Sequence, residues 1–188
     1  MFFSFHLFTG LTSSPSIPPL QHQLPETDWE NPRLLSIAPM RHPIDRLLSG
    51  SEVQIPNGTL HEWWNYARDD RFTDNFAMRI LSGYECCKGA RTSPVFLERA
   101  KAMVRRFTYV LDVACMDAGM KAVADDLNMQ NFALSYVKQN NHKHVHQSAK
   151  ERIPYPEVYE YLLEKNRLDI ELYEWSKTLA LVNCSLES

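Results

Sequence analysis

The fold of this chain is decided by one stretch that runs from Arg33 to Gly50, RLLSIAPMRHPIDRLLSG. Its first half is an apolar run of the length expected for a buried strand, and Pro39 restricts that strand to the edge or end of a sheet. Its second half starts with Pro43, which suits the first turn of a helix, and Asp45 follows where a negative charge favours the helix dipole. An apolar strand that ends in Arg41 directly before a helix is typical of an anion site.

The side chains around this strand and helix can be divided by direction. Ile44, Leu47 and Leu48 share one helix face, and we expect them to pack on the sheet. Arg41 and Ser49 then point elsewhere, so both can reach one phosphate group. The plainer alternative is that Arg41 makes a surface ion pair and that Ser49 is an ordinary surface residue.

The rest of the chain is predicted to contain further helices and one more strand. Helices are expected from a cap at Thr59 or Asn57 through residue 66, around 76–81, from Ser93 to about 106, and over 116–127, with a strand at 107–113 and a polar break at 68–74. A second strand that follows helices after the first predicts a parallel pair. The expected fold class is therefore α/β, with a small parallel sheet flanked by helices.

Two C-terminal helices give a clear amphipathic pattern, with a break near Asn166. The residues expected to face inward are Val158, Tyr161, Leu162, Leu168, Leu172, Trp175 and Leu179. Asp169 and Tyr173 are expected on a solvated polar rim of the second helix.

Composition excludes some classes of function. The chain has 188 residues, 44% of them hydrophobic and 23% charged, which is typical of one globular domain. Its formal net charge of -3 argues against general binding of nucleic acids, because such proteins usually carry a basic balance.

Cysteines and histidines suggest two further features. The four cysteines lack zinc-finger spacing, but Cys86 or Cys87 could bridge to Cys184 in an oxidising compartment. Sequons for N-glycosylation begin at Asn57 and Asn183. His142, His144 and His146 alternate as metal ligands on a strand would, yet no nearby acid or cysteine completes a set, so a solvated loop without metal is expected.

Three segments resemble the carbohydrate sulfotransferases related to the heparan sulfate enzymes. Arg41, Pro43, Arg46 and Ser49 match the family's Arg-x-Pro-x-x-Arg-x-x-Ser signature. Residues 74–83 resemble its Asn-x-x-x-Arg-x-Leu segment, and residues 166–174 resemble its closing Asn-x-x-Asp-x-x-Leu-Tyr helix. The resemblance extends more loosely from residue 33 to residue 184.

The resemblance implies a P-loop-NTPase-like sulfotransferase fold and transfer of a sulfuryl group from 3'-phosphoadenosine-5'-phosphosulfate to a carbohydrate hydroxyl. Arg41 and Ser49 would hold the donor's 3'-phosphate, since a guanidinium forms paired, charge-assisted hydrogen bonds to phosphate. Asn75 and Arg79 would line the donor or acceptor cleft, although Arg79 could instead form a surface ion pair with Asp70 or Asp74. The implied partner is a glycan, the implied location the Golgi lumen or membrane, and no metal is needed.

The beginning of the chain departs from the family pattern. The family's Lys-Thr-Gly-x-Thr-Ser turn has only a superficial echo at residues 8–13, with Phe8 where the lysine belongs. We therefore interpret residues 1–30 as an N-terminal extension or loop and residues 31–188 as a partial sulfotransferase domain, incomplete at its N-terminus and without the family's membrane anchor. The possible bases His6, His22, Glu26 and Glu30 match no motif, so the catalytic residue is unassigned.

Three functions follow from these observations. The first is a carbohydrate sulfotransferase, possibly truncated. The second is a noncatalytic remnant that keeps a 3'-phosphate half-site or serves as an interaction domain. The third, a P-loop kinase fragment, is disfavoured because the chain has no Gly-x-x-x-x-Gly-Lys-Ser/Thr sequence.

Overall fold

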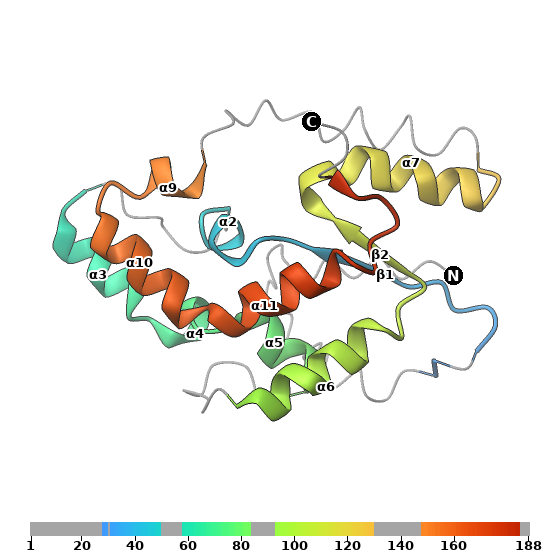
Figure 1. Cartoon of the computed structure of the whole chain (residues 1–188), viewed down its shortest axis with the longest axis horizontal. Helices are drawn as coiled ribbons and strands as arrows, with labels where there is room; N and C mark the ends of the chain where they lie inside the picture. Colours follow the sequence, from blue (N-terminus) through green and yellow to red (C-terminus); the bar gives the residue numbers. More distant parts are fainter. Residues whose placement is uncertain (1–27, 30, 50–57, 84–92, 130–147, 185–188) are drawn as a thin grey trace, which may run out of the picture.

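A pair of parallel strands, β1 (Ile37–Met40) and β2 (Tyr109–Asp112), lies between helices (Figure 1). This computed structural model describes residues 28–29, 31–49, 58–83, 93–129 and 148–184. Met40 pairs with Asp112 at the end of the register, so both strands finish at the same edge of the sheet. The predicted α/β class, with a small parallel sheet and flanking helices, is confirmed.

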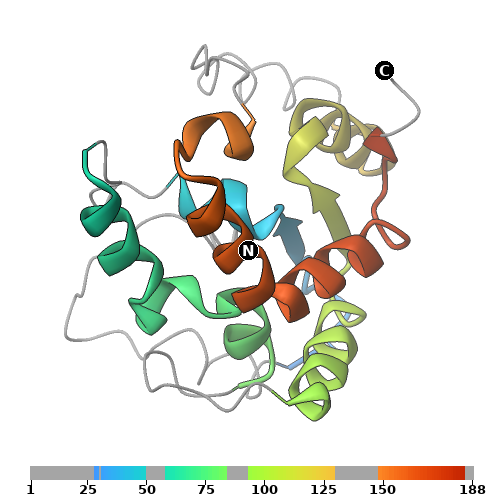
Figure 2. The same ribbon diagram turned by 60° about the vertical axis from the view of Figure 1, so that its left-hand side comes forward.

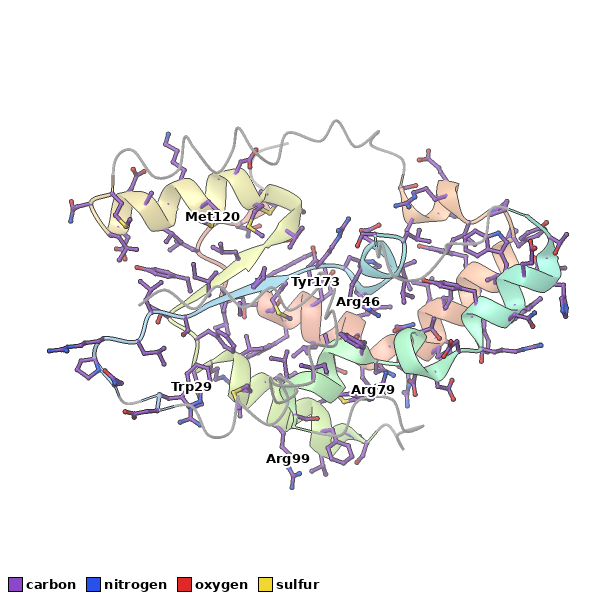
Figure 3. All side chains as sticks on the ribbon, turned by 180° about the vertical axis from the view of Figure 1, so that it is seen from behind. Trp29, Arg46, Arg79, Arg99, Met120 and Tyr173 are labelled. Atoms are coloured by element: carbon purple, nitrogen blue, oxygen red, sulfur yellow. A yellow bond between two sulfur atoms is a disulfide. The ribbon has the colours of Figure 1, made fainter. Side chains whose placement is uncertain are left out.

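Helices cover both faces of the strand pair. Met120 and Val123 of α7 (Met116–Asp126) pack against Tyr109 and Leu111 on one face, and Figure 3 shows Met120 on that side. The other face, which carries Ala38, Met40 and Val110, packs against three helices: α5 (Phe76–Leu81), α6 (Pro94–Val104) and α11 (Arg167–Ser176). Alternation of side chains along each strand therefore serves two separate apolar clusters.

A second core lies beyond the carboxyl ends of the strands. It is formed by α2 (Pro43–Leu47), α3 (Leu60–Ala67), α9 (Ala149–Arg152) and α10 (Pro156–Lys165), which Figure 2 shows grouped together. Ile44, Leu47 and Leu48 are buried here, among Trp63, Val158 and Leu162. The prediction that this face is buried is confirmed, but the expectation that it packs on the sheet is wrong, because α2 turns toward α3 and α10.

Local signals place most helix ends. Thr59, rather than Asn57, caps α3, and its hydroxyl and the Glu62 carboxylate form a reciprocal capping box. Ser93 caps α6 as predicted, with Pro94 in the first turn. The break expected at residues 68–74 contains a further short helix, α4 (Asp70–Thr73). The hydroxyl of Thr73, its last residue, donates to the Asp69 carbonyl.

The C-terminal stripe is confirmed in part. Val158, Leu162, Leu168 and Leu172 are buried, whereas Tyr161 and Leu179 are each 38% exposed. Tyr161 lies edge-on to Trp64 at the surface, and Leu179 comes after the end of α11. Periodicity therefore identified the buried face, except at Tyr161 within α10 and at Leu179 beyond the end of α11.

Gly119 allows α7 to approach β2 closely. A Cβ atom at this position would lie 3.2 Å from Leu111 Cδ2, tighter than ordinary packing. The residue that weakens the helix by propensity is thus the one that lets the helix lie against the sheet.

The disulfide joins Cys115 to Cys184, so the predicted bridge from Cys86 or Cys87 to Cys184 is wrong. Cys86 and Cys87 lie outside the described residues. The segment after α11 runs beside β2, where Leu181 N donates to the Val110 carbonyl and Ala180 forms a parallel bridge with Val110. This pairing brings Cys184 to Cys115, which directly precedes α7.

None of the helices in the described ranges is both long and apolar enough to cross a membrane.

Candidate functional site

The three motif segments, far apart in the sequence, meet where α2, α5 and α11 come together. Asp169 of α11 accepts hydrogen bonds from Ala77 N at 2.9 Å and Met78 N at 2.7 Å, which caps the start of α5. In return, the Asn75 side-chain oxygen accepts from Leu168 N at 3.0 Å and Asp169 N at 2.9 Å, which caps the start of α11. Each helix therefore supplies the cap of the other.

Asn75 is held from several sides in this reciprocal cap. Its backbone is left-handed, with φ 40° and ψ 52°, a conformation that asparagine tolerates better than most residues. Its amide nitrogen donates to the Lys165 carbonyl at 2.6 Å and to the Asp74 carboxylate at 2.9 Å. Asn166 extends the network, because its amide nitrogen donates to the Thr73 and Leu162 carbonyls and its oxygen accepts from Asn75 N.

Two arginines complete this buried cluster. Arg79 is 1% exposed and donates from Nη2 to the Asp70 carbonyl at 3.0 Å, so the alternative that placed this side chain at the surface is wrong. Arg46 lies over the Phe76 ring at 4.7 Å. Burial lowers the pKa of Arg46 and raises the pKa of Asp169, and the opposite charges of the two groups oppose both shifts. Asp169, expected on a solvated rim, is instead the buried counter-charge of two arginines.

Asn75 also borders an open hollow of about 310 Å³, whose other lining residues are Asp74, Tyr161, Glu164, Lys165 and Arg167. Lys165 is already engaged there, since its Nζ donates to the Ala67 carbonyl and the Thr73 hydroxyl and pairs with Asp70 at 2.6 Å. Arg79 is not among the residues that line this hollow. The two predicted cleft residues are thus close together in the cluster, and of these two only Asn75 lines this hollow.

A second, smaller hollow of about 120 Å³ lies at the carboxyl ends of both strands. It is lined by Arg41, His42, Asp45, Asp112, Val113, Ala114 and Tyr173. Ligands of open parallel sheets bind at this edge. Because pockets for whole small molecules usually reach about 300–1,000 Å³, this hollow suits a single group such as a phosphate.

Arg41 is half-buried in this hollow, directly after β1. Its guanidinium makes neither a hydrogen bond nor an ion pair with any of the described residues. Burial lowers its pKa, and the nearby Asp45 carboxylate acts in the opposite direction. A guanidinium stays protonated in proteins, so Arg41 presents a positive charge with unused donors.

Asp112 and Tyr173 form the polar wall opposite. The Tyr173 hydroxyl donates to both carboxylate oxygens of Asp112, at 3.1 Å each, and Ala114 N donates to one of them at 2.9 Å. Burial and the Asp112 charge raise the pKa of Tyr173 well above its usual range. The phenol therefore stays protonated and serves as a donor. Figure 3 shows Tyr173 and Arg46 near the end of β1.

His42 also lines the hollow, a position that sequence reasoning missed. Its ring lies edge-on to the Tyr173 ring with 5.7 Å between centroids, and its Nδ1 is 4.0 Å from an Asp45 carboxylate oxygen. Burial lowers the pKa of His42, against the raising influence of Asp45 and Glu174. Its place directly after Arg41 was the available signal in the sequence.

Ser49 is not brought to Arg41 in this structure. The side chain is exposed, and its hydroxyl donates to the Arg46 carbonyl at 2.8 Å. The residue is absent from the lining of the small hollow. Of the two predicted phosphate ligands, Arg41 lines the small hollow and Ser49 lies at the surface outside it.

Several other candidates lie outside the described residues: the echo at 8–13, the possible bases His6, His22, Glu26 and Glu30, and the three histidines at 142, 144 and 146. Within the described ranges, no group of three His, Cys, Asp or Glu side chains is arranged to hold a metal ion.

No protein-family model, no curated protein and no solved structure matches this chain.

Proposed function

We propose that this chain is a carbohydrate sulfotransferase domain with a P-loop-NTPase-like sulfotransferase fold, in which Arg41 binds the 3'-phosphate of 3'-phosphoadenosine-5'-phosphosulfate. In the reaction, an acceptor hydroxyl oxygen forms a bond to sulfur, the bond from sulfur to the phosphate oxygen breaks to release 3'-phosphoadenosine-5'-phosphate, and the acceptor proton passes to a general base, which is unassigned. The acceptor is a glycan hydroxyl, and the location that goes with this function is the Golgi lumen or membrane.

The observation that carries this proposal is the position of Arg41. Its guanidinium is half-buried at the carboxyl ends of two parallel strands, beside a hollow of phosphate size, and makes no hydrogen bond to the described residues. Partial burial strengthens the attraction between a guanidinium and a phosphate, because water screens the charges less.

The meeting of the three motif segments also supports the proposal. The segments that match the family's motifs contact one another, because Arg46, Asn75 and Asp169 lie in one cluster. The cluster joins α2, which follows Arg41, to α11, which carries Tyr173. It thereby fixes two walls of the hollow relative to each other.

Two carboxylates in the hollow, those of Asp45 and Asp112, repel a bound anion, and their surroundings weaken this repulsion. Both oxygens of Asp112 accept hydrogen bonds from Tyr173, and one also accepts from Ala114 N. The Asp45 side chain is 43% exposed, so water screens its charge.

Binding of 3'-phosphoadenosine-5'-phosphate tests the proposal. At about 100 times its Kd, this product should stabilise the chain by about 2.7 kcal/mol, which raises Tm by roughly 5–10 °C. Arg41→Ala should abolish the shift, and Arg41→Lys should restore only part of it, since lysine lacks the paired donors. Differential scanning fluorimetry measures both effects.

Arg33→Ala is the matched control, because it removes an exposed arginine that precedes β1 and should keep the full shift. An unchanged melt of the wild-type chain at saturating ligand contradicts the nucleotide site. Because Phe8 stands where the family's lysine belongs, we expect no transfer of labelled sulfate to a glycan by this chain alone, and observed transfer would contradict that expectation.

A further inference from the structure

We propose that His42 is a second phosphate-binding residue of the small hollow, and that it takes up a proton when the phosphate binds. This inference rests on the proposed function, since the phosphate is the 3'-phosphate of the nucleotide. Its consequence is that affinity for the nucleotide increases as the pH falls toward 6.

The geometry places His42 beside the same ligand as Arg41. The two residues are adjacent in the chain, follow β1 directly and both line the hollow of about 120 Å³. The His42 ring is packed edge-on against Tyr173, which limits its movement. A group small enough to enter this hollow and contact Arg41 therefore lies close to the imidazole.

The charges in the hollow explain why a proton is needed. Arg41 supplies one positive charge, whereas Asp45 and Asp112 supply two negative charges, and Tyr173 is neutral. With a neutral His42, the lining thus has a net negative charge and disfavours a phosphate dianion. Protonation of His42 brings the lining to neutrality and adds a donor for a phosphate oxygen.

The surrounding charged groups do not remove this imbalance. Glu174 and Lys177 of the α11 end act on His42 in opposite directions and pair with each other at 2.9 Å. Arg152 of α9 is close enough to lower the pKa of Arg41, but its own guanidinium is bonded to the Leu48 carbonyl. Among the groups that line the hollow, His42 is the one whose ordinary pKa lies near neutrality.

The direction of the pH effect follows from linkage. Burial lowers the pKa of His42 in the free protein from the ordinary value of a histidine, which favours the neutral imidazole at pH 7. A bound dianion favours the charged form and raises this pKa, so binding takes up a proton between the free and bound pKa values. Affinity should then fall by up to about tenfold per pH unit as the pH rises through that window. The pH range in which we expect this dependence starts at about pH 6, because above that pH the phosphate carries its second negative charge.

Isothermal titration calorimetry with 3'-phosphoadenosine-5'-phosphate tests the inference directly. The titration is run at pH 7 in several buffers of different ionisation enthalpy, which gives the number of protons taken up. Wild-type protein should take up more protons than His42→Gln, by up to one per ligand. The difference between the two removes the contribution of the ligand's own phosphates.

Affinity measured from pH 6 to pH 8 provides the second readout. His42→Gln should lose the extra pH dependence and bind at each pH about as weakly as wild type does at pH 8. His42→Lys, which keeps a positive charge, should lose the dependence and bind at pH 8 more tightly than wild type. Circular dichroism melts without ligand verify that both variants are folded.

The outcomes separate this inference from the proposed function. Binding that depends on Arg41 but has equal proton uptake in wild type and His42→Gln overturns the role of His42 and leaves the proposed function intact. No binding by wild type at any pH overturns the proposed function and this inference with it.

Discussion

Asp169→Ala is expected to destabilise the protein by about 3–5 kcal/mol, which lowers Tm by roughly 6–20 °C. The Asp169 side chain is 2% exposed and accepts from two backbone N–H groups at the start of α5. Alanine would leave both N–H groups without their acceptor and would remove the counter-charge of half-buried Arg46 and buried Arg79. Thermal and urea denaturation, followed by circular dichroism, measure the loss.

Glu171→Ala is the matched control for this prediction. Glu171 lies on the same helix and pairs with Lys101 at 2.9 Å, but its side chain is 56% exposed. Surface ion pairs contribute about 0–1 kcal/mol, so the control should lose little. If Asp169→Ala melts within a degree or two of Glu171→Ala, the reciprocal cap is not what holds α5 to α11.

A double-mutant cycle with Asn75→Ala tests the reciprocity itself. Asn75 accepts from Asp169 N while Asp169 accepts at the start of the helix that Asn75 precedes. Removing both side chains should therefore cost less than the sum of the single losses, with a coupling of about 0.5–3 kcal/mol. Strict additivity would mean that the two caps act independently.

Local sequence signals were sufficient for most of the secondary structure. Pro43, Ser93 and Pro156 act at helix starts, and the apolar run before Arg41 forms β1 as predicted. Such signals act over one turn or one strand and do not depend on distant residues. The parallel pairing was predictable because helices separate the two strands.

Packing partners were not predictable in the same way. Ile44 faces inward whether α2 packs on the sheet, as expected, or on α10, as observed. Which of the two it contacts depends on the direction in which the chain leaves β1. Tyr161 has the spacing of a core residue but is 38% exposed. In the same helix, Val158 and Leu162 are the residues buried in the second core. Periodicity identifies a face and leaves open which element covers it.

The candidate site shows the same division. The position of Arg41 at the end of β1 was predictable because a charged residue after an apolar strand is a local feature of the sequence. The roles of Asn75 and Asp169 are caps formed between residues about ninety positions apart, with separations of 92 and 94 for Ala77–Asp169 and Asn75–Asp169. A short motif carries no sign of which distant helix start its side chain will cap.

Reduction of the Cys115–Cys184 disulfide is expected to destabilise the protein by about 2–4 kcal/mol, a fall in Tm of roughly 4–16 °C. The two cysteines are 69 residues apart, so the bond restricts a long loop of the unfolded chain. It also holds the segment that pairs with β2 through Leu181 N and the Val110 carbonyl. Thermal melts with and without a phosphine reductant measure the effect.

The pairing itself could not be chosen from the sequence, because the four cysteines allow several connections and the deciding contact lies beside β2. The double variant Cys115→Ser with Cys184→Ser should melt at the reduced temperature and be insensitive to reductant. Cys86→Ser with Cys87→Ser, the matched control, should keep the reductant-dependent fall in Tm. A non-reduced peptide map that joins Cys184 to Cys86 or Cys87 would contradict this pairing, and with it the position of the C-terminal segment along β2.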